Sequence, residues 1–130
     1  MFLIIGSVLA ALAALVHVYI FVLESVRWTH ASTRRIFGVA SEEDARTMKQ
    51  LAFNQGFYNL FLAVTTVIGI VVALAVAPPI GIALMLAGTG MMLAAALVLV
   101  IADGSKLRAA TVQGTLPLLA VISLIIAALV

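Results

Sequence analysis

Two side chains able to exchange protons, His17 and Glu24, stand in the first apolar stretch of the chain. They are seven residues apart, which at 3.6 residues per turn puts them about 20° apart on one face of a helix. Imidazole and carboxyl groups are common general acids and bases in enzymes. We therefore consider His17 and Glu24 a candidate acid/base pair. We expect both to face the interior of a helical bundle, as polar side chains within hydrocarbon usually do.

A second group of polar side chains is concentrated in little more than one helical turn. Asn54, Gln55, Tyr58 and Asn59 cover an arc of about 140° on a helix, and Gly56 leaves a gap beside them. We expect these four side chains to form a ligand-binding patch. Three further ligand-binding candidates stand at a similar depth: Tyr19, Trp28 and Gln113.

Each of these residues also has a purely structural interpretation. Glu24 could be an interfacial residue paired with Arg27, and His17 could be a neutral imidazole that bridges two helices. The patch in the second span could only hold helices together, at about 1 kcal/mol or less per contact. Trp28 stands where aromatic residues anchor helices in the membrane interface. Holding four helices together needs one or two polar bridges, so the convergence of this many polar groups favours a pocket.

Metal and cofactor chemistry has little support in the sequence. His17 and His30 share no helical register, and no His and Glu have the spacing of a metal-binding motif. The absence of cysteine excludes thiol nucleophiles, disulfide relays and cysteine-ligated metal centres. Gly88-Thr89-Gly90 lacks the strand and helix that flank a nucleotide-binding loop, so we expect a packing notch there. We expect neither a metal nor a cofactor.

Helices that cross a membrane must position these candidates. Of the 130 residues, 65% are hydrophobic and 9% are charged, against roughly half and roughly a quarter in soluble domains. A span needs about 20 apolar residues, so we expect four spans, at about 2–24, 50–77, 80–102 and 107–130. The sequence predicts an all-α, polytopic membrane protein, a single four-transmembrane-helix bundle without a soluble catalytic domain. Nucleic-acid binding is excluded, because five acidic residues oppose the seven basic ones, which adjoin membrane segments.

The second span is expected to be the end of a longer helix. Ser41 is followed by three acidic residues, which is typical of a helix N-terminus. Pro78 and Pro79 cannot continue the helix and end it. One unbroken helix over residues 42–77 would measure roughly 50 Å, so its first turns would project from the membrane.

The positive charges predict an orientation. Five of the seven Lys and Arg residues lie in the loop at about 25–41 and the helix start that follows, and two follow the third span. The turn between the second and third spans has none. The positive-inside rule then places both charged loops in the cytoplasm and both termini on the non-cytoplasmic side.

Several of these residues belong to a family pattern. The pattern is carried by His17-Val18-Tyr19-Ile20, Glu24, Trp28, Phe37-Gly38 and, above all, residues 51–63. On these motifs the chain resembles, over nearly its whole length, a family of small bacterial integral membrane proteins known as domain-of-unknown-function family 1304. Phe57, where we would expect Leu, and Leu60, where we would expect a small residue, are mild departures. The resemblance implies a four-helix, multi-pass protein of the bacterial inner (plasma) membrane, and it implies no activity.

Three classes of function remain open, and they include both enzymes and proteins without catalytic activity. The first is a polar pocket in the cytoplasmic half of the bundle that binds or converts a small hydrophobic or lipid-like molecule, with proton transfer by His17 and Glu24. The second is a small proton-coupled transporter that works as a dimer, although Glu24 stands at the end of its span and the charges favour a single orientation. The third is a structural subunit of a membrane complex, which the small-residue stripe of Gly6, Ala10 and Ala14 favours. Because four short helices enclose little volume, we expect a homo-oligomer in the lipid bilayer.

Overall fold

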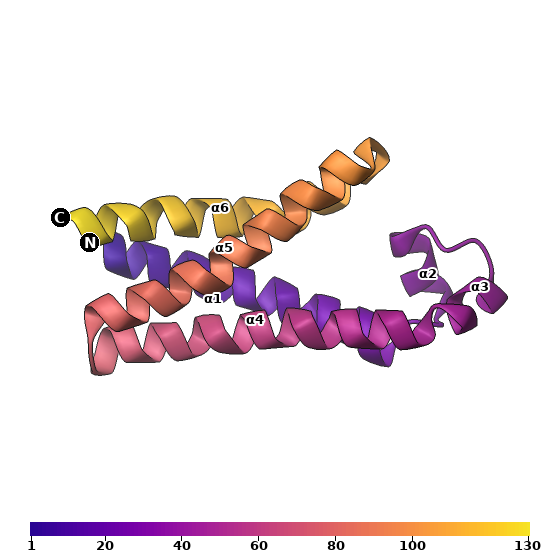
Figure 1. Cartoon of the computed structure of the whole chain (residues 1–130), viewed down its shortest axis with the longest axis horizontal. Coiled ribbons are helices and arrows are strands. Elements are labelled where there is room, and N and C mark those ends of the chain that lie inside the picture. The colour runs from indigo at the N-terminus through magenta and orange to yellow at the C-terminus, as the bar shows by residue number, and fades with distance from the viewer.

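Four long helices form the body of the protein (Figure 1). The computed structural model describes all residues 1–130 and contains helices and turns but no strand. The first long helix, α1 (Phe2–Phe21), continues into a π-helical turn, η1 (Val22–Val26), and the others are α4 (Lys49–Ala75), α5 (Pro78–Ala102) and α6 (Leu107–Leu129). All four are long and apolar enough to cross a membrane. The prediction of an all-α, multi-pass membrane bundle is confirmed.

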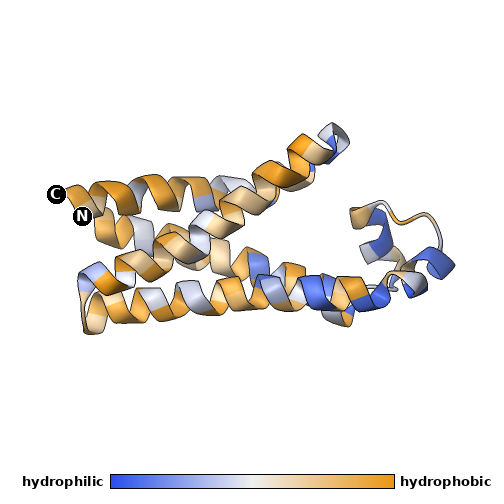
Figure 2. Ribbon diagram, in the orientation of Figure 1, coloured by the Kyte–Doolittle hydropathy of each residue, from blue (hydrophilic) through white to orange (hydrophobic).

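The short elements lie together at one end of the bundle. They are α2 (Ala31–Phe37), α3 (Glu42–Thr47) and the 3-10 turn η2 (Gly104–Lys106). We call this end the loop end, and we call the other end, where both termini and the α4–α5 turn lie, the terminal end (Figure 1). Figure 2 shows that the strongly hydrophilic residues gather mainly at the loop end and that hydrophobic residues dominate the long helices.

Each long helix has two neighbours. Helix α1 packs against α4 and α6, and α5 packs against the same two helices. Packing is closest toward the terminal end, where a side chain on Gly81 would overlap the backbone of Ala73 and one on Gly69 would come within 2.7 Å of the Met85 nitrogen. Small residues therefore let the backbones of α4 and α5 approach closely there. The core of this half consists of Ala10, Ala73, Ile82, Met85, Ala120 and Leu124.

The expectation of one unbroken helix over residues 42–77 is wrong. Helix α3 ends at Thr47 and α4 begins at Lys49, with Met48 between them at φ −85° and ψ −2°. Trp28 Nε1 donates a hydrogen bond to the carbonyl oxygen of Ala45 at 2.8 Å. In an unbroken helix that oxygen would accept from the N–H of Lys49. The indole therefore bonds to the carbonyl oxygen at which the helical hydrogen bonds are interrupted.

Candidate functional site

Glu24 lies on the π-helical turn at the loop end of α1. This turn is marked by the hydrogen bond from the Arg27 nitrogen to the Val22 oxygen at 2.9 Å, five residues apart. The side chain of Glu24 is half-buried, and its Oε2 accepts a hydrogen bond from Asn59 Nδ2 of α4 at 2.9 Å. Glu24 Oε1 has no hydrogen-bond partner in the protein. One of the two carboxylate oxygens is therefore free to accept from another molecule.

Close contact between η1 and α4 holds this pair in place. Ser25 Oγ donates to the carbonyl oxygen of Phe53 at 2.9 Å. A Cβ atom on Gly56 would overlap Ser25 Oγ and would come within 3.1 Å of Glu24 Cβ. Gly56 is thus the position at which the two backbones approach, and the Glu24–Asn59 pair lies beside that approach. Ser25 was not among the predicted site residues, because a serine after Glu24 has no distinctive sequence signal.

Gln55 and Tyr58 lie on the face of α4 that points toward α5. Gln55, Leu62 and Gly69 are spaced seven residues apart, so they share one helix face with a drift of only about 20° per step. Leu62 and Gly69 are close to Gly88 and Met85 of α5, respectively. Gln55 is exposed and Tyr58 is 66% exposed. The α4 face that contacts α5 near the terminal end is therefore uncovered near the loop end.

The uncovered face corresponds to a divergence of the helices. Helices α4 and α5 lie side by side at their connecting turn and separate toward the loop end (Figure 1). The antiparallel register that pairs Leu62 with Gly88 puts Ala95, which is exposed, level with Gln55. We call the exposed residues Gln55 and Tyr58 of α4, together with the exposed Ala95 of α5, the α4–α5 opening. One polar contact crosses the loop end beyond it, from Lys106 Nζ to the carbonyl oxygen of Phe37 in α2 at 3.3 Å.

His17 lies deeper in the bundle and has a different partner from Glu24. It is 1% exposed, and its Nδ1 lies 2.9 Å from the carbonyl oxygen of Ala13. A carbonyl oxygen only accepts, so Nδ1 carries the hydrogen, and Nε2 has no partner in the protein. Seven residues separate His17 from Glu24, or about 10 Å along the helix axis. The two side chains form no hydrogen bond with each other, and the π turn, which sequence spacing did not reveal, changes the helical register between them.

The remaining predicted residues divide between structural and exposed positions. Trp28 is 7% exposed and packs on Phe37 with ring centroids 5.2 Å apart, so it anchors the short helices at the loop end. Tyr19 is 57% exposed, and Asn54 is also exposed. Gln113 of α6 is half-buried and is level with His17, because Gly6 of α1 faces Leu124 of α6 and the two helices are antiparallel. The structure thus joins Asn59 with Glu24 and leaves Asn54, Gln55 and Tyr58 without a side-chain hydrogen bond.

The comparisons with known proteins give a family. A family model described as "Protein of unknown function (DUF1304)" matches residues 11–125, which is most of the chain. The matched region includes all of the residues described above as predicted site residues, from His17 to Gln113. No curated protein and no solved structure matches the chain.

Proposed function

The chain belongs to the DUF1304 family, and we propose that it binds a small lipid-like molecule whose polar end reaches the Glu24–Asn59 pair through the α4–α5 opening. One observation carries the proposal. A half-buried carboxyl group with a free oxygen lies beside a helix face, that of Gln55 and Tyr58, which the neighbouring helix does not cover. Uncovered polar side chains at membrane depth are expensive, so an occupant that pairs with them would lower that cost.

The chemistry of the pair favours a ligand whose polar end donates hydrogen bonds. An ionised carboxylate only accepts hydrogen bonds, whereas the amide of Gln55 and the hydroxyl of Tyr58 can donate or accept. A hydroxyl or ammonium group would therefore suit Glu24 Oε1, and an ionised fatty acid would be repelled by it. The apolar tail would lie against Leu62 of α4, which is partly exposed. We propose a neutral or cationic amphiphile as the ligand class.

Chemical conversion of such a ligand would use the two predicted titratable groups separately. Glu24 would be the acid/base group at the opening, where the ligand's polar end binds. His17 would act only on a ligand that reaches about 10 Å deeper, since its side chain is 1% exposed. Direct proton transfer between His17 and Glu24 is not part of this proposal.

Binding can be measured through the single tryptophan of the chain, Trp28, which stands four residues after Glu24. The purified full chain in detergent is titrated with a long-chain fatty alcohol that carries a nitroxide, and quenching of Trp28 fluorescence is followed. We expect saturable quenching and a Kd that rises about tenfold in Glu24→Gln, because a hydrogen bond to a charged group contributes about 1.5–3 kcal/mol. Asn59→Leu should weaken binding in the same direction.

The matched control is Glu43→Gln, which removes the same charge from an exposed position of α3. It should bind the alcohol as the unmodified chain does. A nitroxide fatty acid of equal length should bind more weakly than the alcohol at neutral pH. Quenching that rises linearly without saturation, or that is equal in all variants, would show that the alcohol only partitions into the micelle.

We also propose that the loop end faces the cytoplasm of a bacterial cell, since all seven Lys and Arg residues stand in or beside the loops of that end. The chain has no cysteine, so the labelling of a single introduced thiol reports the side of the membrane on which that residue lies. In intact cells Ser32→Cys should resist a membrane-impermeant maleimide, whereas Ala77→Cys in the α4–α5 turn should react. The reverse pattern would overturn this orientation.

A further inference from the structure

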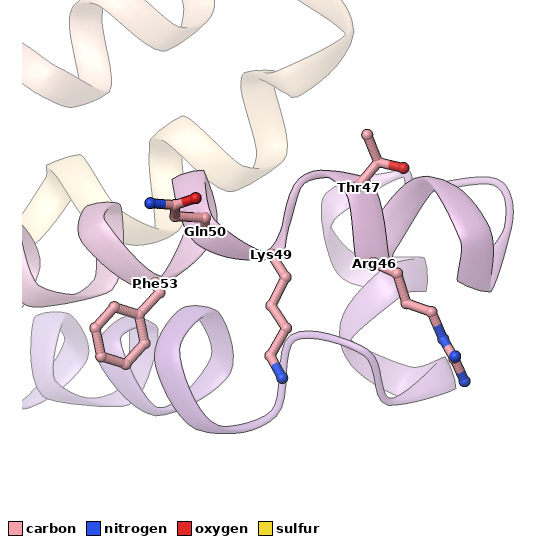
Figure 3. Close-up of a pocket in the computed structure, with 5 residues that line it drawn as sticks. All are labelled: Arg46, Thr47, Lys49, Gln50 and Phe53. Atoms are coloured by element: carbon pink, nitrogen blue, oxygen red, sulfur yellow. The ribbon is translucent and has the colours of Figure 1, made fainter.

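A cavity at the junction of α3 and α4 lies away from the α4–α5 opening. It is a shallow depression that is open to the surface, and it is lined by Arg46, Thr47, Lys49, Gln50 and Phe53 (Figure 3). The cavity lies on both sides of Met48, where α3 ends and α4 begins.

Two of the five residues that line the cavity, Arg46 and Lys49, are cationic. Arg46 forms a salt bridge with Glu42 through Nη2 and also donates to it through Nε, yet its side chain is 73% exposed. The side chain of Lys49 forms no salt bridge and no hydrogen bond within the protein. In Figure 3 the side chains of Arg46, Lys49 and Phe53 extend to the same side of the α3–α4 junction. An unpaired ammonium and a guanidinium with an unused donor group, which line the same depression, favour an anion with several oxygens.

The position of the cavity favours the headgroup of a lipid over a soluble anion. Lys49 is the first residue of the second membrane-length helix, so the cavity lies where that helix would leave the hydrocarbon. Lipid phosphates occupy this level of a bilayer, and basic residues next to a span attract anionic lipids. Phe53 belongs to the cavity and also begins a row of aromatic rings that runs along α4 away from the charges.

This aromatic row offers a surface for an acyl chain. The ring centroids of Phe53 and Phe57 are 4.8 Å apart and those of Phe57 and Phe61 are 6.0 Å apart. Phe21 of α1 packs on Phe57 at 5.1 Å and fixes the middle of the row. Phe53 and Phe61 remain 46% and 57% exposed. Phe57 is two residues from Gln55, or about 200° around the helix, so the row lies on the opposite side of α4 from the α4–α5 opening.

We propose that the cavity binds the phosphate headgroup of an anionic phospholipid, with one acyl chain along Phe53, Phe57 and Phe61. The site is independent of the Glu24–Asn59 pair, and its ligand has the opposite charge preference. Each cation near an anionic lipid surface contributes about fivefold in affinity. Lys49, which has no partner in the protein, should therefore account for a preference of that size.

Native mass spectrometry of the full chain tests the proposal. The chain is released from mixed micelles that contain equal amounts of phosphatidylglycerol and phosphatidylcholine. We expect phosphatidylglycerol adducts to exceed phosphatidylcholine adducts about fivefold or more, and Lys49→Gln to reduce that ratio about fivefold. Lys49→Arg should preserve the ratio. Arg108→Gln, which removes an exposed cation at the start of α6, is the matched control and should reduce the ratio less than Lys49→Gln does.

Three results would overturn the site. An equal loss in Arg108→Gln and Lys49→Gln would mean that only the overall charge matters. Displacement of the lipid by an equal concentration of soluble glycerol phosphate would mean that the cavity takes a free anion and that the aromatic row contributes nothing. Absence of any preference in the unmodified chain would contradict the site directly. Because none of these variants touches Glu24 or Asn59, the outcome is separable from the binding of the fatty alcohol.

Discussion

At the scale of single residues, the hydrogen bonds of each polar side chain decide whether it can meet a ligand. His17 and Trp28 donate to the backbone carbonyl oxygens of Ala13 and Ala45 at 2.9 and 2.8 Å. Glu24 and Asn59 are bonded to each other and leave one carboxylate oxygen free. A buried donor is seldom left unpaired, so the indole of Trp28 is committed to the fold. The free oxygen of Glu24 is the group that a ligand can use.

Asp103 supplies a pH-dependent contact at the α5–α6 turn. Its Oδ1 accepts from the hydroxyl of Ser105 at 2.7 Å and from the nitrogen of Ser105 at 2.9 Å, and these bonds lower the pKa of Asp103 below its usual value. The pKa of Asp103 is lower in the folded state than in the unfolded state. The ionised carboxylate therefore stabilises the folded turn at pH values above the unfolded-state pKa. This contribution is lost as the pH falls through the folded pKa.

Ser105→Ala should therefore raise the pKa of Asp103 toward its usual value, because the larger of the two hydrogen-bond effects is removed. A titration followed by carbon NMR of the Asp103 carboxyl group would measure the change. Ser32→Ala, at an exposed position of α2, serves as the control and should leave the titration unchanged. A pKa of Asp103 that is the same with and without the Ser105 hydroxyl would contradict this assignment.

At the scale of elements, the candidate site depends on how η1 approaches α4. A π turn is a local widening of an α-helix and is frequent at functional sites. Here it positions Glu24 and Ser25 against α4, where Gly56 leaves room for them. The sequence alone indicated Gly56 as a gap beside the polar patch, and that interpretation agrees with the contact. It could not indicate the π turn, because the spacing argument assumed 3.6 residues per turn throughout.

Gly56→Ala should destabilise the protein by about 1–3 kcal/mol, since the new Cβ overlaps Ser25 Oγ and its backbone neighbours cannot move freely. The free energy of unfolding in mixed micelles would be measured by denaturant titration. Gly90→Ala in α5 is the matched control, because nothing lies within 4 Å of the new Cβ. It should stabilise the helix by up to about 1 kcal/mol. Equal effects at the two glycines would mean that η1 and α4 do not touch at Gly56.

The break between α3 and α4 gives a second example of what local patterns omit. Ser41 caps α3 as predicted, accepting from the nitrogen of Asp44 at 3.0 Å. Nothing in residues 42–50 is a helix breaker, so the pattern predicts continuation. The break is stabilised by Trp28, which is 17 residues away in sequence from Ala45. A tertiary hydrogen bond of this kind overrides local propensity and is not readable from spacing.

At the scale of the whole molecule, the bundle is tight at one end and open at the other. Glycine and alanine bring α4 and α5 together near the terminal end, and the helices separate toward the loop end (Figure 1). The four membrane-length helices and the concentration of charge at the loop end were predictable from composition and hydropathy. The divergence was not predictable, because it follows from where close packing stops along α4. The homo-oligomer expected from the small enclosed volume stays a prediction.

This asymmetry also explains why the predicted polar patch is divided. Spacing placed Asn54, Gln55, Tyr58 and Asn59 within one arc, and they do share one stretch of α4. Only Asn59 lies close enough to Glu24 to donate a hydrogen bond to it. Gln55 and Tyr58 are exposed, on the face of α4 that contacts α5 nearer the terminal end. Whether a patch is buried thus depends on the neighbouring helix, which a single helical wheel does not include.

The most direct measurement of the central claim is a map of photolabelling by a long-chain fatty alcohol with a diazirine in its tail, bound to the purified full chain. The proposed site predicts labels on Gln55, Tyr58 and Leu62 of α4 and on Ala95 of α5, reduced at least tenfold by excess unlabelled alcohol and in Glu24→Gln. The opposite result is an even distribution of labels over outward-facing side chains such as Leu15 and Val18 of α1, which are 64% and 37% exposed. If such labels were also insensitive to the competitor, they would contradict the proposed site.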